Sequence, residues 1–174
     1  FVLCNQDKMR LFNHIKSQIE DGKRCAIIYP IRNSAEEQKK SVEHASEAWE
    51  RSFPGKVACL HGQMHHEEKT RILDKVKTKE KPLLVSSSII EVGVTIPDLS
   101  TLVVVDAGRY GTSTLHQMRG RLVRQGGQGF FFMLQGVDSL DESHLTDGQK
   151  QTNERLNLLL QTQDGFDLAE LDMQ

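Results

Sequence analysis

The sequence predicts an α/β fold with a mostly parallel, buried sheet flanked by helices. Five short apolar runs recur along the chain, and each is continuous rather than alternating, which is typical of strands buried on both faces of a parallel sheet. Segments with helical periodicity separate several of these runs, and strands that alternate with helices favour right-handed crossovers. The runs are CAIIYPI (25–31), VACL (57–60), PLLVS (82–86), TLVVVD (101–106) and FFFML (130–134).

One helix is expected before the first of these runs and two between the runs that follow. The first covers 7–21 and is closed by Gly22, the second begins at a capping box formed by Ser34 and Glu37, and the third covers 66–79. Apolar residues recur at helical spacing in each, so one face of each helix packs on the sheet. These faces comprise Met9, Phe12, Ile15 and Ile19; Val42, Ala45, Trp49 and Phe53; and Ile72, Leu73 and Val76.

The composition favours a soluble, cytoplasmic globular protein. Hydrophobic residues make up 37% of the 174 positions, yet no apolar run is long enough to cross a bilayer and no secretion signal is present. Three scattered cysteines fit reduced thiols. The formal charge of −2 argues against coating nucleic acid by bulk electrostatics but leaves room for a local basic groove. Because residue 1 is Phe, we expect a longer parent protein.

A polar, turn-rich stretch, QGVDSLDESHLTDGQ (135–149), predicts a domain boundary. We therefore expect a main α/β unit at 1–136. The second part, 137–174, is expected to hold a linker and a short C-terminal helical appendage, with a helix near 150–161.

The stretch LHQMRGRLVRQGG gathers three arginines in a chain with no surplus of positive charge. If 113–124 is helical, Gln117, Arg121 and Arg124 fall within one stripe. That stripe suits a multiply charged oxyanion such as a triphosphate, and an exposed basic face with salt bridges is the alternative. Arg119 points elsewhere, as for a surface ion pair. The residues expected to anchor this helix to the sheet are Leu115, Met118 and Leu122.

Small polar residues follow two of the predicted strands. SSSIIEVGVTIPDLS (86–100) leaves one strand through three serines, and LHGQM (60–64) follows another. Hydroxyls and free backbone N–H groups at the carboxyl end of a strand can hold phosphates, and ligands of open α/β sheets bind in that crevice. Together with the end of the first run, these segments predict one continuous groove for a sugar-phosphate backbone.

The order of YPI, LHGQM, SSSIIEVGVTIP and HQMRGRLVR resembles the second RecA-like lobe of a superfamily 2 helicase, and the last two segments are similar to helicase motifs V and VI. IEVGVTIP followed by VVVDAGRYGTSTLHQMRGRLVR is most similar to the RecG family of branched-DNA helicases. RLNLLLQTQDGFDLAELDM (155–173) resembles the start of the motif that follows the motor lobes in that family. The resemblance runs from Lys8 to the end of the chain.

The resemblance implies a role in ATP hydrolysis with Mg²⁺, both held mainly by a first RecA-like lobe that this chain lacks. Arg124 is then the arginine finger, Arg121 its partner on the γ-phosphate side, and Gln117 a neighbour that senses the nucleotide. Gly93 and Thr95 are also expected near the nucleotide. This fits phosphoryl transfer, which needs positioning and positive charge above all.

The DNA contacts implied by the resemblance fall on His61, Gly62, Ser87 and Ser88. The implied partners are single-stranded or branched duplex DNA and the first lobe of the same full-length protein, with no membrane. Thr95 departs from the acidic residue usual in the family, which puts a ribose contact in doubt. Val123 replaces a usual glycine, a change expected to affect packing only.

Two helicase features are missing from the sequence. No GxxxxGK[ST] phosphate loop occurs, because the GK pairs at 22–23 and 55–56 lack its spacing. DESH (141–144) imitates the metal-binding motif II, but it follows GVDSL rather than a buried strand and lies after the arginines, so it is interpreted as a solvated turn. The fragment alone is therefore expected to be inactive, as the second motor lobe of a longer helicase.

Two other functions fit the same sequence. One is the motor lobe of a transcription–repair coupling factor, although DGFDLAE is more similar to RecG. The other is a non-catalytic nucleic-acid-binding module, which retention of the arginine stripe argues against. No metal site is expected, since the HxxxH spacing of His61 and His65 leads from a loop into a helix. Cys25 and Cys59 lie in predicted strands and are expected to be buried and inert.

Overall fold

The computed structural model describes residues 1–30, 34–87, 96–122 and 128–161. Its sheet has six strands in the order β1-β6-β5-β2-β4-β3, and every neighbouring pair is parallel. The predicted α/β class with a parallel sheet is therefore confirmed. The strands are β1 (Val2–Leu3), β2 (Arg24–Ile28), β3 (Val57–Leu60), β4 (Leu83–Ser86), β5 (Leu99–Val105) and β6 (Phe130–Leu134).

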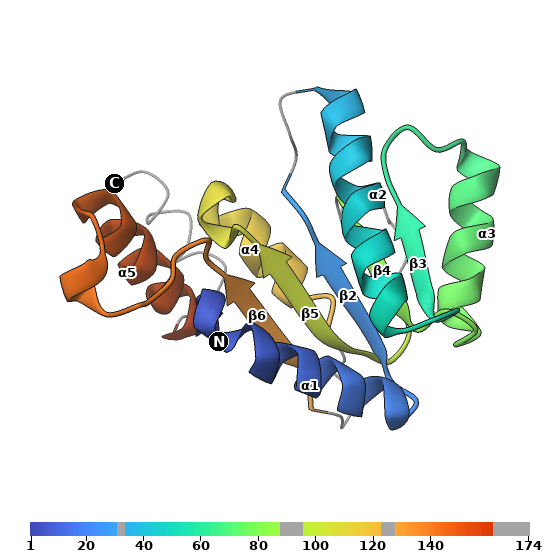
Figure 1. Cartoon of the computed structure of the whole chain (residues 1–174), viewed down its shortest axis with the longest axis horizontal. Coiled ribbons are helices and arrows are strands. Elements are labelled where there is room, and N and C mark those ends of the chain that lie inside the picture. The colour runs from blue at the N-terminus through green and yellow to red at the C-terminus, as the bar shows by residue number, and fades with distance from the viewer. Residues whose placement is uncertain (31–33, 88–95, 123–127, 162–174) are drawn as a thin grey trace.

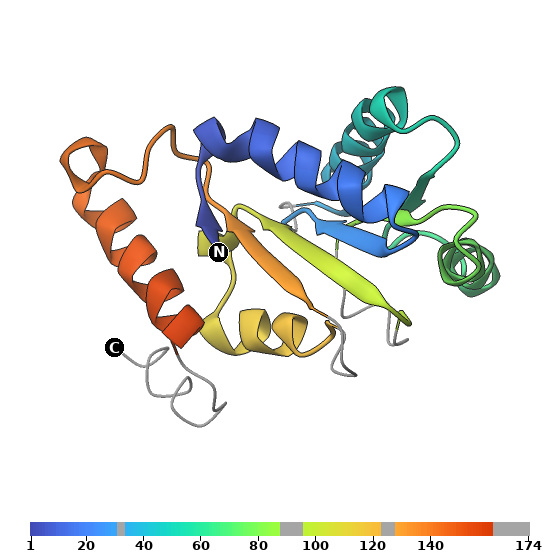
Figure 2. The ribbon, with the colours of Figure 1, turned by 90° about the horizontal axis from the view of Figure 1, so that it is seen from below.

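Helices cover both faces of the sheet, with α1 and α2 on one side and α3, α4 and α5 on the other (Figures 1 and 2). Each side has its own apolar core: Ile15 and Ile27 are buried on the first side, and Leu102 and Leu115 on the second. The helices are α1 (Lys8–Glu20), α2 (Ala35–Ser52), α3 (His66–Lys77), α4 (Thr112–Arg119) and α5 (Asp147–Gln161), with short 3₁₀ turns η1 (Asn5–Asp7), η2 (Ala107–Arg109) and η3 (Glu142–His144).

The sequence analysis missed the edge strand β1. Val2 and Leu3 pair with Met133 and Leu134 of β6, and the amino terminus donates a hydrogen bond of 2.7 Å to the carbonyl of Phe131. A strand of two residues is too short to carry an alternating or continuous apolar pattern, so only its pairing reveals it. The N-cap at Ser34 is confirmed, because its hydroxyl accepts the backbone N–H of Glu37 at 3.2 Å.

Helix α4 is shorter than predicted. It ends at Arg119 with Gly120 as its C-cap, and the next N–H, that of Arg121, donates to the carbonyl of Met118 in a tight turn. A continuous helix over 113–124 is therefore wrong, and the geometric argument for a single helical stripe fails beyond Arg119. The anchoring role is confirmed, since Leu115, Met118 and Leu122 are all buried in the core on this side of the sheet.

Arg119 links α4 to α5 through hydrogen bonds. Its Nη1 donates to the carbonyl of Leu159 at 2.8 Å, and its Nη2 lies 3.0 Å from Nδ1 of His116. Leu156 and Leu159 are completely buried in the same core as α4. The described part of residues 137–174 thus packs on the main unit, and the division at residue 136 stays a prediction.

Two further sequence features can be placed. DESH (141–144) forms the exposed turn η3, in which the Asp141 carboxylate accepts the backbone N–H of Ser143, so its interpretation as a solvated turn is confirmed. In the part of the chain that the structure describes, no helix is both long enough and apolar enough to span a membrane.

Candidate nucleic-acid and nucleotide interface

The carboxyl ends of β2, β4 and β3 lie side by side. Ile28 of β2 and Leu60 of β3 both pair with Ser86 of β4, and the N–H of Tyr29 donates to the carbonyl of Ser86 at 2.8 Å. The residues that come next, Tyr29, Ser87 and His61, therefore form a row across this edge. The structure brings together the strand ends that the sequence analysis assigned to one groove.

Among the residues that the structure describes, two buried polar atoms in this row have no hydrogen-bond partner. They are Oγ of Ser87, a residue with no exposed surface, and Nδ1 of His61, which is 5% exposed. More than nine in ten buried polar groups in proteins are paired, and each orphan costs about 1–3 kcal/mol. Two such atoms on neighbouring strand ends indicate a site whose partner is an external group.

The protonation of His61 is set mainly by its burial, which lowers the pKa of the imidazole below its ordinary value of 6.5. The carboxylate of Glu43, with Oε1 3.7 Å from Nε2, acts in the opposite direction. A neutral imidazole carries one N–H donor and one acceptor nitrogen. His61 can therefore donate through Nδ1 when its tautomer places the proton there.

The loop after His61 is exposed, and the adjacent helix α3 places a positive charge beside it. Gly62 is exposed, and its carbonyl accepts a hydrogen bond of 3.0 Å from the ammonium group of Lys69 on α3. The loop leads directly into the first turn of α3, which begins at His66. A cation beside an exposed glycine backbone suits a phosphate group.

The residues assigned to the nucleotide lie on and just after α4, which covers the same face of the sheet as α3. Gln117 is exposed on α4, and Arg121 is half-buried in the turn that follows α4. Their helix begins just after η2 and packs on β5 and β6 through Leu115 and Met118. Four other predicted site residues lie outside the described part of the chain: Ser88, Gly93, Thr95 and Arg124.

Sequence reasoning missed a second hollow, which is lined by segments far apart in the chain. Lys8, Tyr29, Trp49, Asp106 and Gln135 all face it. No single motif carries them, and only the strand order brings them together. Trp49 and Phe53 pack against Phe12, as their shared apolar helix face predicts, and Trp49 also lines this hollow.

The remaining candidates have simple structural roles. His65 and His66 are exposed, and the described residues contain no group of three or more His, Cys, Asp or Glu side chains that could hold a metal ion. Burial raises the pKa of the Cys25 thiol to about 12, and burial also raises that of Cys59. Both are consistent with unreactive thiols.

Comparison with known proteins now identifies the family. Residues 7–126, more than two thirds of the chain, match the family described as the helicase conserved C-terminal domain. The chain belongs to this helicase family. The match includes the row at the carboxyl edge and the turn that carries Arg121, so both lie within the conserved helicase domain.

Within the helicase family, the chain is similar to RecG. It is 31% identical over 168 residues to the ATP-dependent DNA helicase RecG of Aquifex aeolicus, covering 95% of this chain and 20% of that protein. For RecG of Bacillus subtilis the identity is 30% over 171 residues, with 95% and 23% covered. A solved structure of RecG bound to a three-way DNA junction superposes with a TM-score of 0.75 at 25% identity, over 98% of this chain and 21% of that one.

These comparisons confirm the RecG resemblance and the RecA-like fold inferred from the motifs. The chain spans about a fifth of the length of the curated relatives it matches.

Proposed function

We propose that this chain is the second motor lobe of an ATP-dependent DNA helicase that remodels branched DNA, such as forks and junctions, in recombination and repair. The similarity to RecG supports the class of enzyme. The observation that carries the DNA site is the pair of unpartnered polar atoms, Nδ1 of His61 and Oγ of Ser87, on neighbouring strand ends.

In this proposal the row binds the DNA backbone. The hydroxyl of Ser87 and an N–H at Nδ1 of His61 donate to phosphate oxygens, with the backbone of Gly62 and the hydroxyl of Ser88 beside them. Lys69 adds a positive charge. Such contacts position a strand without reading its sequence, as a motor that moves along DNA requires. Both atoms are buried, so a phosphate reaches them only after a local rearrangement.

ATP is proposed to bind between this lobe and a first RecA-like lobe of the same protein, which supplies the phosphate loop and holds Mg²⁺. Arg124 and Arg121 would then contact the phosphates, with Gln117, Gly93 and Thr95 near the nucleotide. Arginine suits this position because its planar fork binds phosphate oxygens in pairs and stays charged. Bound Mg²⁺ would neutralise charge on the phosphates. The chain alone is expected to be inactive in ATP hydrolysis.

The test is ATP turnover by the full-length parent protein with and without forked DNA. Arg124→Ala should lower DNA-stimulated turnover by about 10³-fold or more, while ATP binding persists. Arg71→Gln, on the exposed face of α3, is the matched control and should leave turnover unchanged. Turnover that is absent in the wild type would instead support a non-catalytic nucleic-acid-binding module, whereas turnover unaffected by Arg124→Ala would mean that the arginines serve only the fold.

A further inference from the structure

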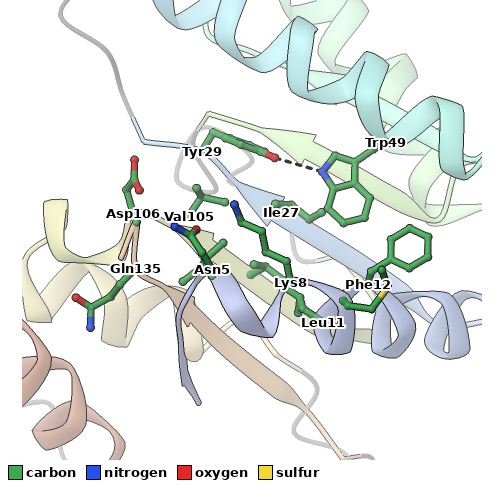
Figure 3. Close-up of a pocket in the computed structure, with 14 residues that line it drawn as sticks. Asn5, Lys8, Leu11, Phe12, Ile27, Tyr29, Trp49, Val105, Asp106 and Gln135 are labelled. Atoms are coloured by element: carbon green, nitrogen blue, oxygen red, sulfur yellow. Dashed lines mark hydrogen bonds between the residues drawn. The ribbon is translucent and has the colours of Figure 1, made fainter. Parts of the chain in front are cut away.

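A cavity of about 530 Å³ opens at the carboxyl edge of the sheet between α1 and α2 (Figure 3). It lies over the ends of β2 and β5, which are neighbours in the sheet. After β2 the chain continues into α2 on one face, whereas after β5 it continues through η2 into α4 on the opposite face. Such a topological switch point is where open α/β sheets bind ligands.

The walls of the cavity are apolar and aromatic. Ile27 lines it from the sheet, as does Val103 of β5, while Phe12 of α1 and Trp49 of α2 form an aromatic side (Figure 3). The indole N–H of Trp49 donates to the hydroxyl of Tyr29 at 3.2 Å, which fixes both rings at the rim. The volume falls within the range of about 300–1,000 Å³ typical of small-ligand pockets. These walls suit a planar ring.

Polar residues from separate segments line the opposite side, where the amides of Asn5 and Gln135 donate to Asp138 and Asn153 rather than into the cavity. Asp106, directly after β5, holds a left-handed backbone with φ 49° and ψ 48°. That conformation is uncommon outside glycine and is enriched at functional sites. Gln135 and Asn5 stand at the ends of two further strands, and Lys8 extends from α1 across the opening (Figure 3).

The charged groups of Lys8 and Asp106 indicate which class of ligand the cavity suits. Within the described part of the chain, no ion pair joins Lys8 to a carboxylate. A purely apolar ligand would leave the exposed ammonium of Lys8 and the half-buried carboxylate of Asp106 without a partner in the cavity. A ligand with an anion for Lys8 and hydroxyl donors for Asp106 satisfies both, since a carboxylate only accepts.

We propose that this pocket binds a nucleoside monophosphate unit, with the base against Trp49 and Ile27, the sugar hydroxyls toward Asp106 and the phosphate on Lys8. The site is separate from the proposed ATP contacts, because Arg121 follows α4 on the opposite face of the sheet. The unit can come from a free nucleotide or from one nucleotide of a nucleic-acid strand, since the recognising chemistry is shared.

The chain contains a built-in reporter, because Trp49 is its single tryptophan and lines the cavity. Titration of the 174-residue chain with AMP should give a saturable, one-site change in tryptophan fluorescence. Lys8→Gln should weaken AMP binding about tenfold but leave adenosine binding unchanged, because only AMP carries the phosphate. Asp106→Asn, which tolerates the same backbone conformation, should weaken adenosine and AMP equally.

The matched control is Lys16→Gln, which removes the same charge from the same helix at a separate hollow beside Phe53. It should bind AMP as the wild type does, and so should Arg121→Ala, which separates this site from the proposed ATP contacts. Competition with a short oligodeoxyadenylate distinguishes the two sources: tighter binding of the oligonucleotide assigns the site to a strand, and tighter binding of AMP to a free nucleotide. Absence of a saturable change, or equal AMP affinity in Lys8→Gln and the wild type, would overturn the proposal.

Discussion

Replacement of Arg24 by methionine should destabilise the fold strongly, although Arg24 is far from the proposed sites. The guanidinium of this buried residue donates to the carbonyls of Val76 and Lys77, which end α3, and to the carbonyl of Pro97 ahead of β5. It also lies 3.3 Å from the carboxylate of Asp98. The last carbonyls of a helix have no partners within it, so Arg24 caps α3 from a neighbouring strand.

The magnitude follows from these contacts. Three backbone carbonyls lose a charged donor, and each such bond contributes about 1.5–3 kcal/mol. The loss is partly offset because methionine keeps the apolar stem and removes the cost of burying the charge. We therefore expect a decrease of about 3 kcal/mol in the free energy of unfolding. In a chain of this length that corresponds to a fall of about 6–12 °C in Tm.

The assay is equilibrium denaturation in urea, with circular dichroism confirming native secondary structure before unfolding. Asp98→Asn is the matched control: the Asp98 side chain is 62% exposed, and asparagine tolerates its backbone φ of 52°. It should cost less than about 1 kcal/mol, as exposed ion pairs usually do. A loss below about 1 kcal/mol in Arg24→Met, or an equal loss in the control, would refute the capping argument.

Three further predictions concern stability and reactivity. Arg155→Ala removes hydrogen bonds of 2.8 and 2.9 Å to the carbonyls of Tyr110 and Gly108. The free energy of opening α5 should therefore fall by about 2 kcal/mol, and its amide hydrogens should exchange faster. Unchanged exchange would contradict this tether. Burial raises the pKa of Cys25 to about 12, so its thiol should react with a thiol reagent at pH 8 only on unfolding. Fast labelling of the native chain would contradict this and show that the strand around Cys25 opens. Burial lowers the pKa of His14 below 6.5, so on acidification the unfolded chain takes up this proton before the folded chain does. The free energy of unfolding should therefore fall as the pH drops below about 6.5. His14→Gln should make this pH dependence weaker, and an unchanged pH dependence would contradict the assignment to His14.

Much of the fold follows from the sequence because its strands are buried on both faces. Runs such as FFFML (130–134) and VACL (57–60) coincide with β6 and β3, since continuous apolar residues leave few other structures. Periodicity likewise places α1 within one residue of its expected limits. Where pattern and packing agree, sequence reasoning succeeds.

The errors occur where tertiary packing decides. Helix α4 ends at Arg119, although the periodic pattern continues to Arg124, because Gly120 caps the helix and Leu122 turns in to pack beside Gly129. Arg119 itself was expected at the surface, yet α5 offers it the carbonyl of Leu159. The contact between Arg119 and Leu159 has no local signal, since the partners are distant in sequence, whereas Gly120 is a local stop signal that the periodic pattern obscured.

Some residues of the candidate sites could be predicted from the sequence, and others could not. Motif order alone pointed to His61 and Ser87, and the strand register then places them side by side. The cavity beneath Lys8 and Asp106 had no signal, because five segments build it and the left-handed backbone of Asp106 is invisible in the sequence. Roles in binding remain predictions for both sets.

We propose that one lobe holds DNA at the carboxyl edge of the sheet and ATP at the turn after α4. The most direct test is ATP turnover by the full-length parent protein as a function of forked-DNA concentration. Ser87→Ala should leave folding intact, because its Oγ makes no hydrogen bond, and should raise the half-saturating DNA concentration several-fold at an unchanged maximal rate. Arg121→Ala should lower the maximal rate and leave half-saturation unchanged. If Ser87→Ala leaves half-saturation unchanged, or Arg121→Ala retains the full rate, the assignment of these two sites is wrong.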